Sequence, residues 1–210
     1  MSEIRAVCFD VGGVLTYPIG PVFAARAQAA GVDLHQVAGT FRSFSSPDDG
    51  DEPAHKLERG EITVEEFIDT LGQAGPAARH LMHHESPFFV PEAFRPHEGM
   101  HDFVREVRAH GLKTALITNS VTEWKPWWDR VIPEPEAFDA IVHSCEVGLR
   151  KPGLGIYELT AELLGVEPGE ILFLDDFPAM AAAGREAGFV VIDVHDHDQA
   201  IAEARALLGF

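Results

Sequence analysis

Residues 6–16 read AVCFDVGGVLT, an apolar run that ends on Asp10 and is followed by two glycines. A short apolar stretch broken by glycines is typical of a buried strand that runs into a tight turn. Open α/β sheets bind their ligands beyond the carboxyl ends of the strands, and a charge there is costly unless it is paired or holds a metal. Asp10 is therefore a candidate functional carboxylate, although it could instead cap the helix that follows.

The composition limits the class of protein. A chain of 210 residues with 46% hydrophobic residues suits one domain, with or without a large insertion. Its 34 acidic and 16 basic residues give a formal charge of −18, which repels phosphate backbones and anionic lipids. We therefore expect neither nucleic acid nor a membrane as a partner, while a small anionic substrate would need local positive charge.

Cysteine content and the N-terminal residues favour a cytoplasmic protein. Two cysteines, Cys8 and Cys145, do not make a disulfide framework. The first five residues lack the apolar region of a signal peptide, and no run approaches the roughly 18 apolar residues of a membrane span. The oligomeric state, monomer or homodimer, is left open.

Strand and helix patterns alternate along most of the chain. Helical spacing of apolar residues marks three segments, residues 98–110, 156–164 and 200–208. Short apolar runs predict five parallel strands, at residues 5–9, 113–118, 140–144, 171–175 and 189–194. Alternation of this kind predicts an α/β fold with a doubly wound parallel sheet.

Residues 17–95 differ from the rest, because they contain no convincing strand. Thr63 and Glu66 have the spacing of a capping box, and residues 43–52 resemble a polar loop. We predict a helical domain at 17–95, inserted into a core domain formed by 1–16 and 96–210. An insertion directly after the first strand would stand over the carboxyl ends of the strands, as a lid does.

Polar side chains follow the other predicted strands as well. Thr118 and Asn119 end the second strand, Lys151 follows the third, and Asp175-Asp176 ends the fourth. Taken singly, Thr118 could be a cap, Lys151 a solvated charge and the two aspartates a turn. Because the carboxyl ends of parallel strands meet at one edge, four such groups in this order indicate a common site.

On these four motifs the chain resembles the haloacid dehalogenase-like hydrolase superfamily. The first motif matches at Asp10, the second at Thr118 and Asn119, the third at Lys151 and the fourth at Asp175-Asp176. Residues 57–63 (LERGEIT) and 144–152 (SCEVGLRKP) are similar to the branch with sugar-phosphate phosphatases and the phosphatase domain of soluble epoxide hydrolases. The resemblance implies a five-stranded Rossmann-like core of strand order 5-4-1-2-3 with an inserted α-helical cap.

The resemblance also implies a reaction, the hydrolysis of a small, sugar-phosphate-like phosphomonoester. Asp10 would attack phosphorus and form an aspartyl-phosphate that water then cleaves. Lys151 would neutralise the nucleophile and a phosphoryl oxygen, while Thr118 and the Asn119 amide would hold the remaining oxygens.

A magnesium ion is the cofactor that the resemblance implies. Its ligands would be Asp10, the main-chain carbonyl of Gly12 and Asp176, with Asp175 bound directly or through a neighbouring ligand. Carboxylates, a carbonyl and waters suit this small, hard cation.

Two positions depart from the family's pattern. Gly12 stands where family phosphatases usually have an aspartate that protonates the leaving group, and Met180 stands where an asparagine is usual. Both departures favour an alternative, a catalytically weak or silent binding or regulatory module on the same fold. A second alternative is a 2-haloacid dehalogenase, but that branch typically has an aromatic residue at Gly12 and needs no metal, so Asp175-Asp176 argues against it.

Aromatic residues and histidines are further candidates. Trp124, Trp127 and Trp128 could line a substrate surface, although packing under a helix is the more common use of such residues. Within the predicted insertion, residues suggested for substrate selection by location alone are Tyr17, Phe41, Phe44 and His55.

Overall fold

A parallel sheet organises the computed structural model, which describes residues 3–18, 20–21, 24–25, 28, 44, 46–72, 95–125, 128, 131–132 and 134–210. The strands lie in the order β3-β2-β1-β4-β5, which is the predicted order 5-4-1-2-3 counted from the opposite edge. All four strand pairings are parallel. The predicted doubly wound α/β class is therefore confirmed.

Each strand begins and ends within one residue of its prediction. The bounds are β1 (Ala6–Phe9), β2 (Lys113–Thr118), β3 (Ala140–His143), β4 (Ile171–Asp175) and β5 (Val190–Asp193). In the register, Phe9 pairs with Leu116 on one side and Leu174 on the other. Asp10 and Asp175 thus follow paired residues on neighbouring strands, and the sheet holds them level.

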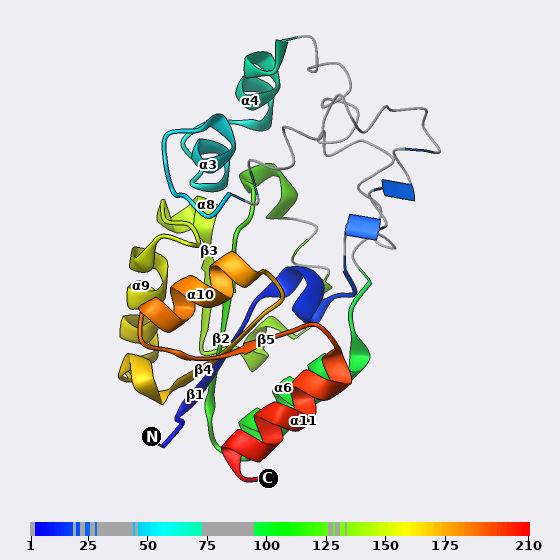
Figure 1. Cartoon of the computed structure of the whole chain (residues 1–210), viewed down its shortest axis with the longest axis vertical. Coiled ribbons are helices and arrows are strands. Elements are labelled where there is room, and N and C mark those ends of the chain that lie inside the picture. The colour runs from blue at the N-terminus through cyan, green and yellow to red at the C-terminus, as the bar shows by residue number, and fades with distance from the viewer. Residues whose placement is uncertain are drawn as a thin grey trace.

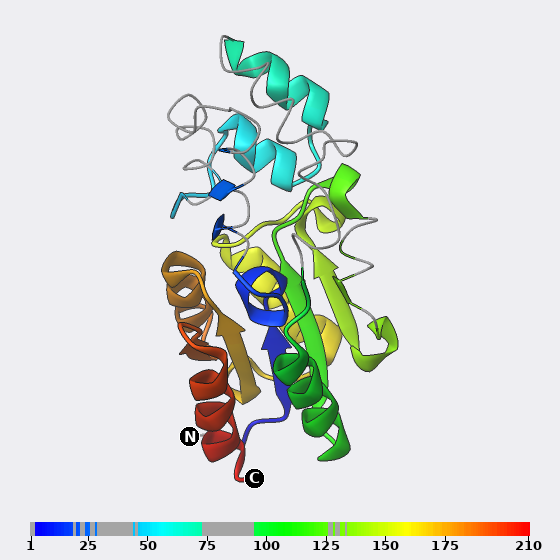
Figure 2. The same cartoon turned by 90° about the vertical axis from the view of Figure 1, so that its right-hand side faces the viewer.

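Two helices cover each face of the sheet (Figures 1 and 2). α6 (Glu98–Ala109) and α11 (His197–Leu208) lie on one face, and α9 (Leu154–Leu164) and α10 (Pro178–Glu186) lie on the other. Side chains of β1 alternate between the faces, with Val7 and Phe9 in the α6–α11 cluster and Cys8 in the α9–α10 cluster. Because both faces are covered, the strands are mainly apolar, as their sequences predict.

The structure also describes shorter elements. They are η1 (Val11–Leu15), α3 (Pro53–Glu58), α4 (Val64–Thr70), η4 (Thr122–Trp124), η5 (Pro135–Ala137), α8 (Ser144–Val147) and η6 (Pro168–Glu170). None of the helices that the structure describes is both long and apolar enough to cross a membrane.

Helices α3 and α4 lie beyond the carboxyl ends of the strands, above the arrowhead of β1 in Figure 2. The predicted capping box is present at the start of α4, where Thr63 and Glu66 bond to each other's main-chain N–H groups. Leu57 and Phe67 belong to a small apolar cluster separate from those of the sheet. Helices therefore stand where the cap is predicted, although the division at 17–95 stays a prediction because much of that range, Phe41 included, lies outside the described residues.

The chain leaves the core and returns to it at one point. Thr16 and Pro96 form an isolated antiparallel bridge. On either side of it, Tyr17 N donates to Arg95 O at 3.0 Å and His97 N donates to Leu15 O at 2.8 Å. The two connections of the predicted cap are thus held side by side.

Phe173 of β4 is fully buried and makes edge-to-face contacts with Tyr157 and Phe189, at centroid distances of 5.7 and 6.3 Å. We expect Phe173→Ala to lower the free energy of unfolding by about 3–5 kcal/mol, measured by urea denaturation, because it leaves a cavity between β4 and its helices. Phe177→Ala, at a side chain that is 37% exposed, should cost less than about 1 kcal/mol. Equal losses in the two variants would contradict this account of the core.

Candidate active site

Asp10 stands at the carboxyl end of β1, where the chain turns sharply. Its main-chain N–H donates to Leu174 O of the neighbouring strand at 2.9 Å, which fixes it beside β4. Gly13 in the following turn has φ +85°, a left-handed conformation that favours glycine. A Cβ built on Gly13 would lie 2.1 Å from Asp176 Oδ2. Glycine at this position therefore lets the turn and the second aspartate of β4 approach each other.

Lys151 connects the ends of β1 and β4. Its ammonium donates to Asp10 Oδ1 at 2.8 Å and to Asp175 Oδ2 at 2.6 Å. The lysine is 2% exposed and Asp175 is fully buried. Burial alone would lower the pKa of this ammonium, but the two carboxylates raise the pKa above its ordinary range. Lys151 is therefore a permanent cation between two carboxylates.

Asn119 holds the main chain of Lys151 in place. Its Oδ1 accepts from Lys151 N at 2.9 Å, and its Nδ2 donates to Lys151 O at 2.9 Å. Thr118, at the end of β2, is 2% exposed and its hydroxyl is 3.4 Å from Asn119 O. The side-chain amide of Asn119 thus fixes the position of Lys151.

Three carboxylates gather at this edge of the sheet. One oxygen each of Asp10, Asp175 and Asp176 lies within 4.8 Å of the others, so these residues could hold a metal ion. Burial raises the pKa of Asp175 to about 6, against the effect of Lys151. Burial and the charges of Asp10 and Asp175 raise the pKa of Asp176 to about 7. A divalent cation would relieve this crowding of negative charge, so the donor set fits the predicted Mg²⁺.

These groups surround one cavity of about 320 Å³ beyond the carboxyl ends of the strands. Every residue predicted for the site lines it: Asp10, Gly12, Thr118, Asn119, Lys151, Asp175 and Asp176. Phe44, Trp128, Phe177 and Met180 add apolar walls. The positions that sequence reasoning placed at four strand ends are therefore brought together in space.

Two of the remaining candidates have other surroundings. His55 is fully buried, with its Nδ1 accepting from Gly50 N at 3.0 Å. Tyr17 packs against His97 and the guanidinium of Arg95, at 4.8 and 3.9 Å from its ring centroid. Trp128 is 5% exposed and packs in the core as well as lining the cavity, while Trp127 lies outside the described residues.

Sequence reasoning missed Glu58 and Arg150. Glu58, the last residue of α3, lines the cavity, and Arg150 Nε donates to its Oε2 at 2.7 Å. The helical spacing of Ala54, Leu57 and Glu58 was the available signal, because it places the carboxylate on the buried side of α3.

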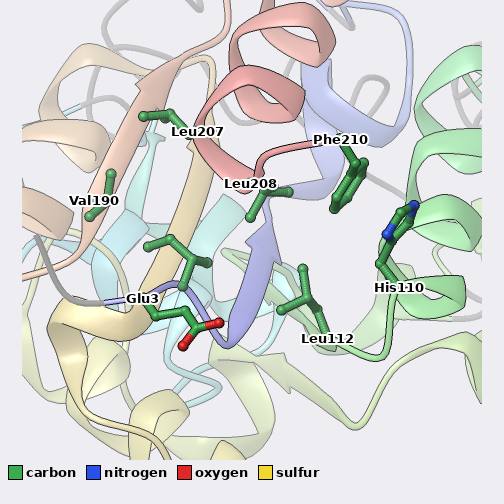
Figure 3. Close-up of a pocket in the computed structure, with 8 residues that line it drawn as sticks. Glu3, His110, Leu112, Val190, Leu207, Leu208 and Phe210 are labelled. Atoms are coloured by element: carbon green, nitrogen blue, oxygen red, sulfur yellow. The ribbon is translucent and has the colours of Figure 1, made fainter.

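A second cavity lies at the amino ends of the strands, away from the candidate site (Figure 3). It measures about 270 Å³ and is lined mainly by apolar side chains near the amino ends of the strands, with His110 stacked on Phe210 at 3.7 Å. Glu3 and His110 are its titratable side chains, and they come from different ends of this cavity in Figure 3. The carboxylates and the lysine of the candidate site all lie at the carboxyl ends of the strands.

A family model described as haloacid dehalogenase-like hydrolase matches residues 4–188. Among curated proteins the chain is similar to acyl-CoA dehydrogenase family member 10 of Mus musculus, 31% identical over 98% of this chain and 19% of that protein. Bifunctional epoxide hydrolase 2 of Rattus norvegicus is 25% identical over 98% of this chain and 39% of its own length. The chain thus spans well under half of these two relatives.

Sesquiterpene phosphatase astK of Aspergillus oryzae is 25% identical, over 99% of this chain and 98% of its own. A family enzyme of Bacteroides thetaiotaomicron, solved with magnesium and inorganic phosphate, has a TM-score of 0.60 at 19% identity and covers 91% of this chain and 94% of its own. L-2-haloacid dehalogenase of Xanthobacter autotrophicus also has a TM-score of 0.60, at 21% identity, over 97% and 83%. At these identities the solved structures establish the fold.

Magnesium should stabilise the protein more at pH 8 than at pH 6. The pKa values of Asp175 and Asp176, about 6 and about 7, lie above their ordinary 3.8, so the metal-free site holds protons that the cation must displace. For the same reason, the metal-free protein should gain stability as the pH falls from 8 through 6, because the folded state then binds more protons than the unfolded chain. Thermal melting with Mg²⁺ or EDTA at both pH values measures both effects.

Asp176→Asn should abolish the Mg²⁺-dependent rise in melting temperature, whereas Asp102→Asn, the same change at an exposed carboxylate of α6, should retain it. A rise that survives in Asp176→Asn would contradict the assignment of the cluster.

Gly13→Ala should weaken Mg²⁺ binding at least about tenfold, because the added methyl group would overlap Asp176 and strain a positive φ. Isothermal titration with Mg²⁺ measures the affinity. Gly111→Ala also strains a positive φ, but it faces open space at the far end of α6, so it controls for backbone strain and should bind Mg²⁺ normally.

Proposed function

The chain belongs to the haloacid dehalogenase-like hydrolase family, and on that premise we propose that it is a Mg²⁺-dependent phosphatase of a small phosphomonoester. The observation that carries the proposal is Lys151, buried between Asp10 and Asp175 with Asp176 beside them. Such a site offers one carboxylate as a nucleophile and further carboxylates for a cation.

Asp10 is the proposed nucleophile. One of its oxygens accepts from Lys151, which orients the carboxylate at the end of β1. Attack on phosphorus forms an aspartyl-phosphate and releases the alcohol, and water then cleaves the phosphoryl group from Asp10. Lys151 offsets the negative charge that builds up when a carboxylate and a phosphate approach each other.

Asp10, Asp176 and the main-chain carbonyl of Gly12 would hold the magnesium ion, with Asp175 beside them. When bound, the ion supplies positive charge to the phosphoryl oxygens and lowers the barrier to attack by an anion. Asp175 also accepts from Phe177 N at 2.8 Å, which fixes its orientation toward Lys151.

Thr118 and the main-chain amide of Asn119 are proposed to bind the remaining phosphoryl oxygens. Both residues line the cavity at the end of β2, opposite Asp176 of β4 across the central strand. The side-chain amide of Asn119 is already bonded to Lys151, so its contribution to substrate binding would come from the main chain.

The cavity walls favour an apolar alcohol as the leaving group. Among the described residues that line the cavity, the side-chain amide of Asn119 is engaged with Lys151, and one carboxylate oxygen of Glu58, Oε2, is engaged with Arg150. Phe44, Trp128, Phe177 and Met180 form the other walls. The similarity to a sesquiterpene phosphatase over nearly the whole length of both chains also supports the phosphate ester of an apolar alcohol. The segments 57–63 and 144–152, which resemble those of sugar-phosphate phosphatases, favour a sugar phosphate instead.

A dehalogenase is the second candidate, favoured by the similar fold of L-2-haloacid dehalogenase. Carbon–halogen hydrolysis through Asp10 would need no metal, so the three clustered carboxylates favour phosphatase chemistry instead. A silent binding module is the third candidate, favoured by Gly12 and Met180 and opposed by the arrangement of Asp10 and Lys151.

We expect the purified protein to release phosphate from a panel of sugar and apolar alkyl phosphomonoesters with Mg²⁺, and EDTA to stop the reaction. Asp10→Asn should lower kcat/KM by at least about 10³-fold, because the nucleophile is lost. Asp102→Asn is the matched control and should retain activity.

Other outcomes of the same assay overturn the proposal. Chloride release from 2-chloropropionate that is insensitive to EDTA would establish the dehalogenase. Tight binding of a phosphomonoester without turnover, in wild type and Asp10→Asn alike, would establish the silent module.

A further inference from the structure

Rapid hydrolysis of an alkyl phosphomonoester needs a group that gives a proton to the departing alcohol oxygen. The turn after Asp10 supplies none, because residues 11–15 are Val, Gly, Gly, Val and Leu. Glycine at position 12 is not required by the backbone, since its φ of −74° and ψ of 112° suit a residue with a side chain. The acid must therefore come from another part of the cavity.

Four carboxyl groups line the cavity among the described residues, and three of them have tasks. Asp10 is the proposed nucleophile, Asp175 is held by Lys151 and Phe177 N, and Asp176 belongs to the proposed metal cluster. The fourth is Glu58, which α3 brings over the carboxyl ends of the strands.

Two hydrogen bonds hold Glu58, and both are accepted by the same carboxylate oxygen. Arg150 Nε donates to Oε2 at 2.7 Å, and Asn119 Nδ2 donates to the same atom at 3.3 Å. Within the described part of the chain, both hydrogen bonds to this carboxyl group end on Oε2. Oε1 accepts neither of these bonds, so it is the oxygen available to a ligand in the cavity that Glu58 lines.

The surroundings of Glu58 suit proton transfer at neutral pH. Its side chain is 9% exposed, and burial raises the pKa of the carboxyl group to about 7. The charged groups that face it are Arg150 and Lys151, which lower the pKa, and Asp49, which raises it. A group with a pKa near the working pH can both give and accept a proton.

We propose that Glu58 is the general acid and base of the phosphatase reaction, supplied by the predicted cap. The inference rests on the proposed function. In the first half-reaction Asp10 bonds to phosphorus, the phosphorus–oxygen bond of the ester breaks, and the departing oxygen takes the proton of Glu58. In the second, Glu58 takes a proton from water as that water attacks phosphorus, and Asp10 leaves as a carboxylate.

The test uses two esters that differ in how much they need an acid. Nitrophenolate leaves without taking up a proton, whereas the hexyl alkoxide must be protonated as it leaves. We expect Glu58→Gln to lower kcat/KM for hexyl phosphate by about 10²-fold or more, and for p-nitrophenyl phosphate by less than about fivefold. Activity on p-nitrophenyl phosphate shows within the same variant that the fold is retained.

The pH profile supplies a second readout. In wild type, kcat/KM for hexyl phosphate should fall as the pH rises through about 7, because Glu58 loses the proton that it must donate. This fall should be absent in Glu58→Gln. Glu61→Gln, at an exposed glutamate of the same segment that is paired with Arg59, is the matched control and should behave as wild type.

Equal losses on both esters, or an unchanged pH profile, would overturn the proposal and leave Glu58 a residue that positions Asn119 and Arg150. If wild type hydrolyses neither ester, the proposed phosphatase function itself fails, which is a different outcome.

Discussion

The structure depends on one buried cation, the ammonium of Lys151. It lies between Asp10 and Asp175, two carboxylates that the parallel register of β1 and β4 brings level at the edge of the sheet. Without it, the buried carboxylate of Asp175 and the partly buried carboxylate of Asp10 would face each other in a medium of low dielectric, which is costly. With it, the third carboxylate of Asp176 still leaves an excess of negative charge. The site therefore keeps a net negative charge that suits a divalent cation, even with Lys151 bound to Asp10 and Asp175.

Arg150, the residue before Lys151, bonds to residues on the other side of the cavity. Its guanidinium is fully buried and donates to Glu58 Oε2, to Asp48 O at 2.8 Å and to Phe44 O at 3.4 Å. Lys151 bonds to side chains at the ends of β1 and β4, and Arg150 bonds to α3 and to the segment before it. Two adjacent cations on one loop therefore link Asp10 to α3, in a protein whose formal net charge is −18.

Much of this architecture could be predicted because its signals are local. Apolar runs gave all five strands to within one residue, and the order of polar groups at the strand ends located Asp10, Lys151 and Asp176 at one edge. Glu58 could not be placed in this way, since its partner Arg150 is 92 residues away and neither residue type suggests burial. Lys151 is predicted at the site, and in the structure tertiary packing turns it toward Asp10 and turns Arg150 toward Glu58. The amide pair between Asn119 and the main chain of Lys151 holds the lysine in place.

The bridge between Thr16 and Pro96 has a consequence for how such a chain can change over time. Because its two ends are already hydrogen-bonded to each other, the excursion between them behaves as a closed loop whose length adds little entropy cost. Segments of other lengths and sequences can be grafted onto the same stem without altering the register of the sheet. The core can thus keep Asp10, Lys151 and the two aspartates while the excursion is exchanged, provided that each new segment again gives the buried Arg150 a partner such as Glu58.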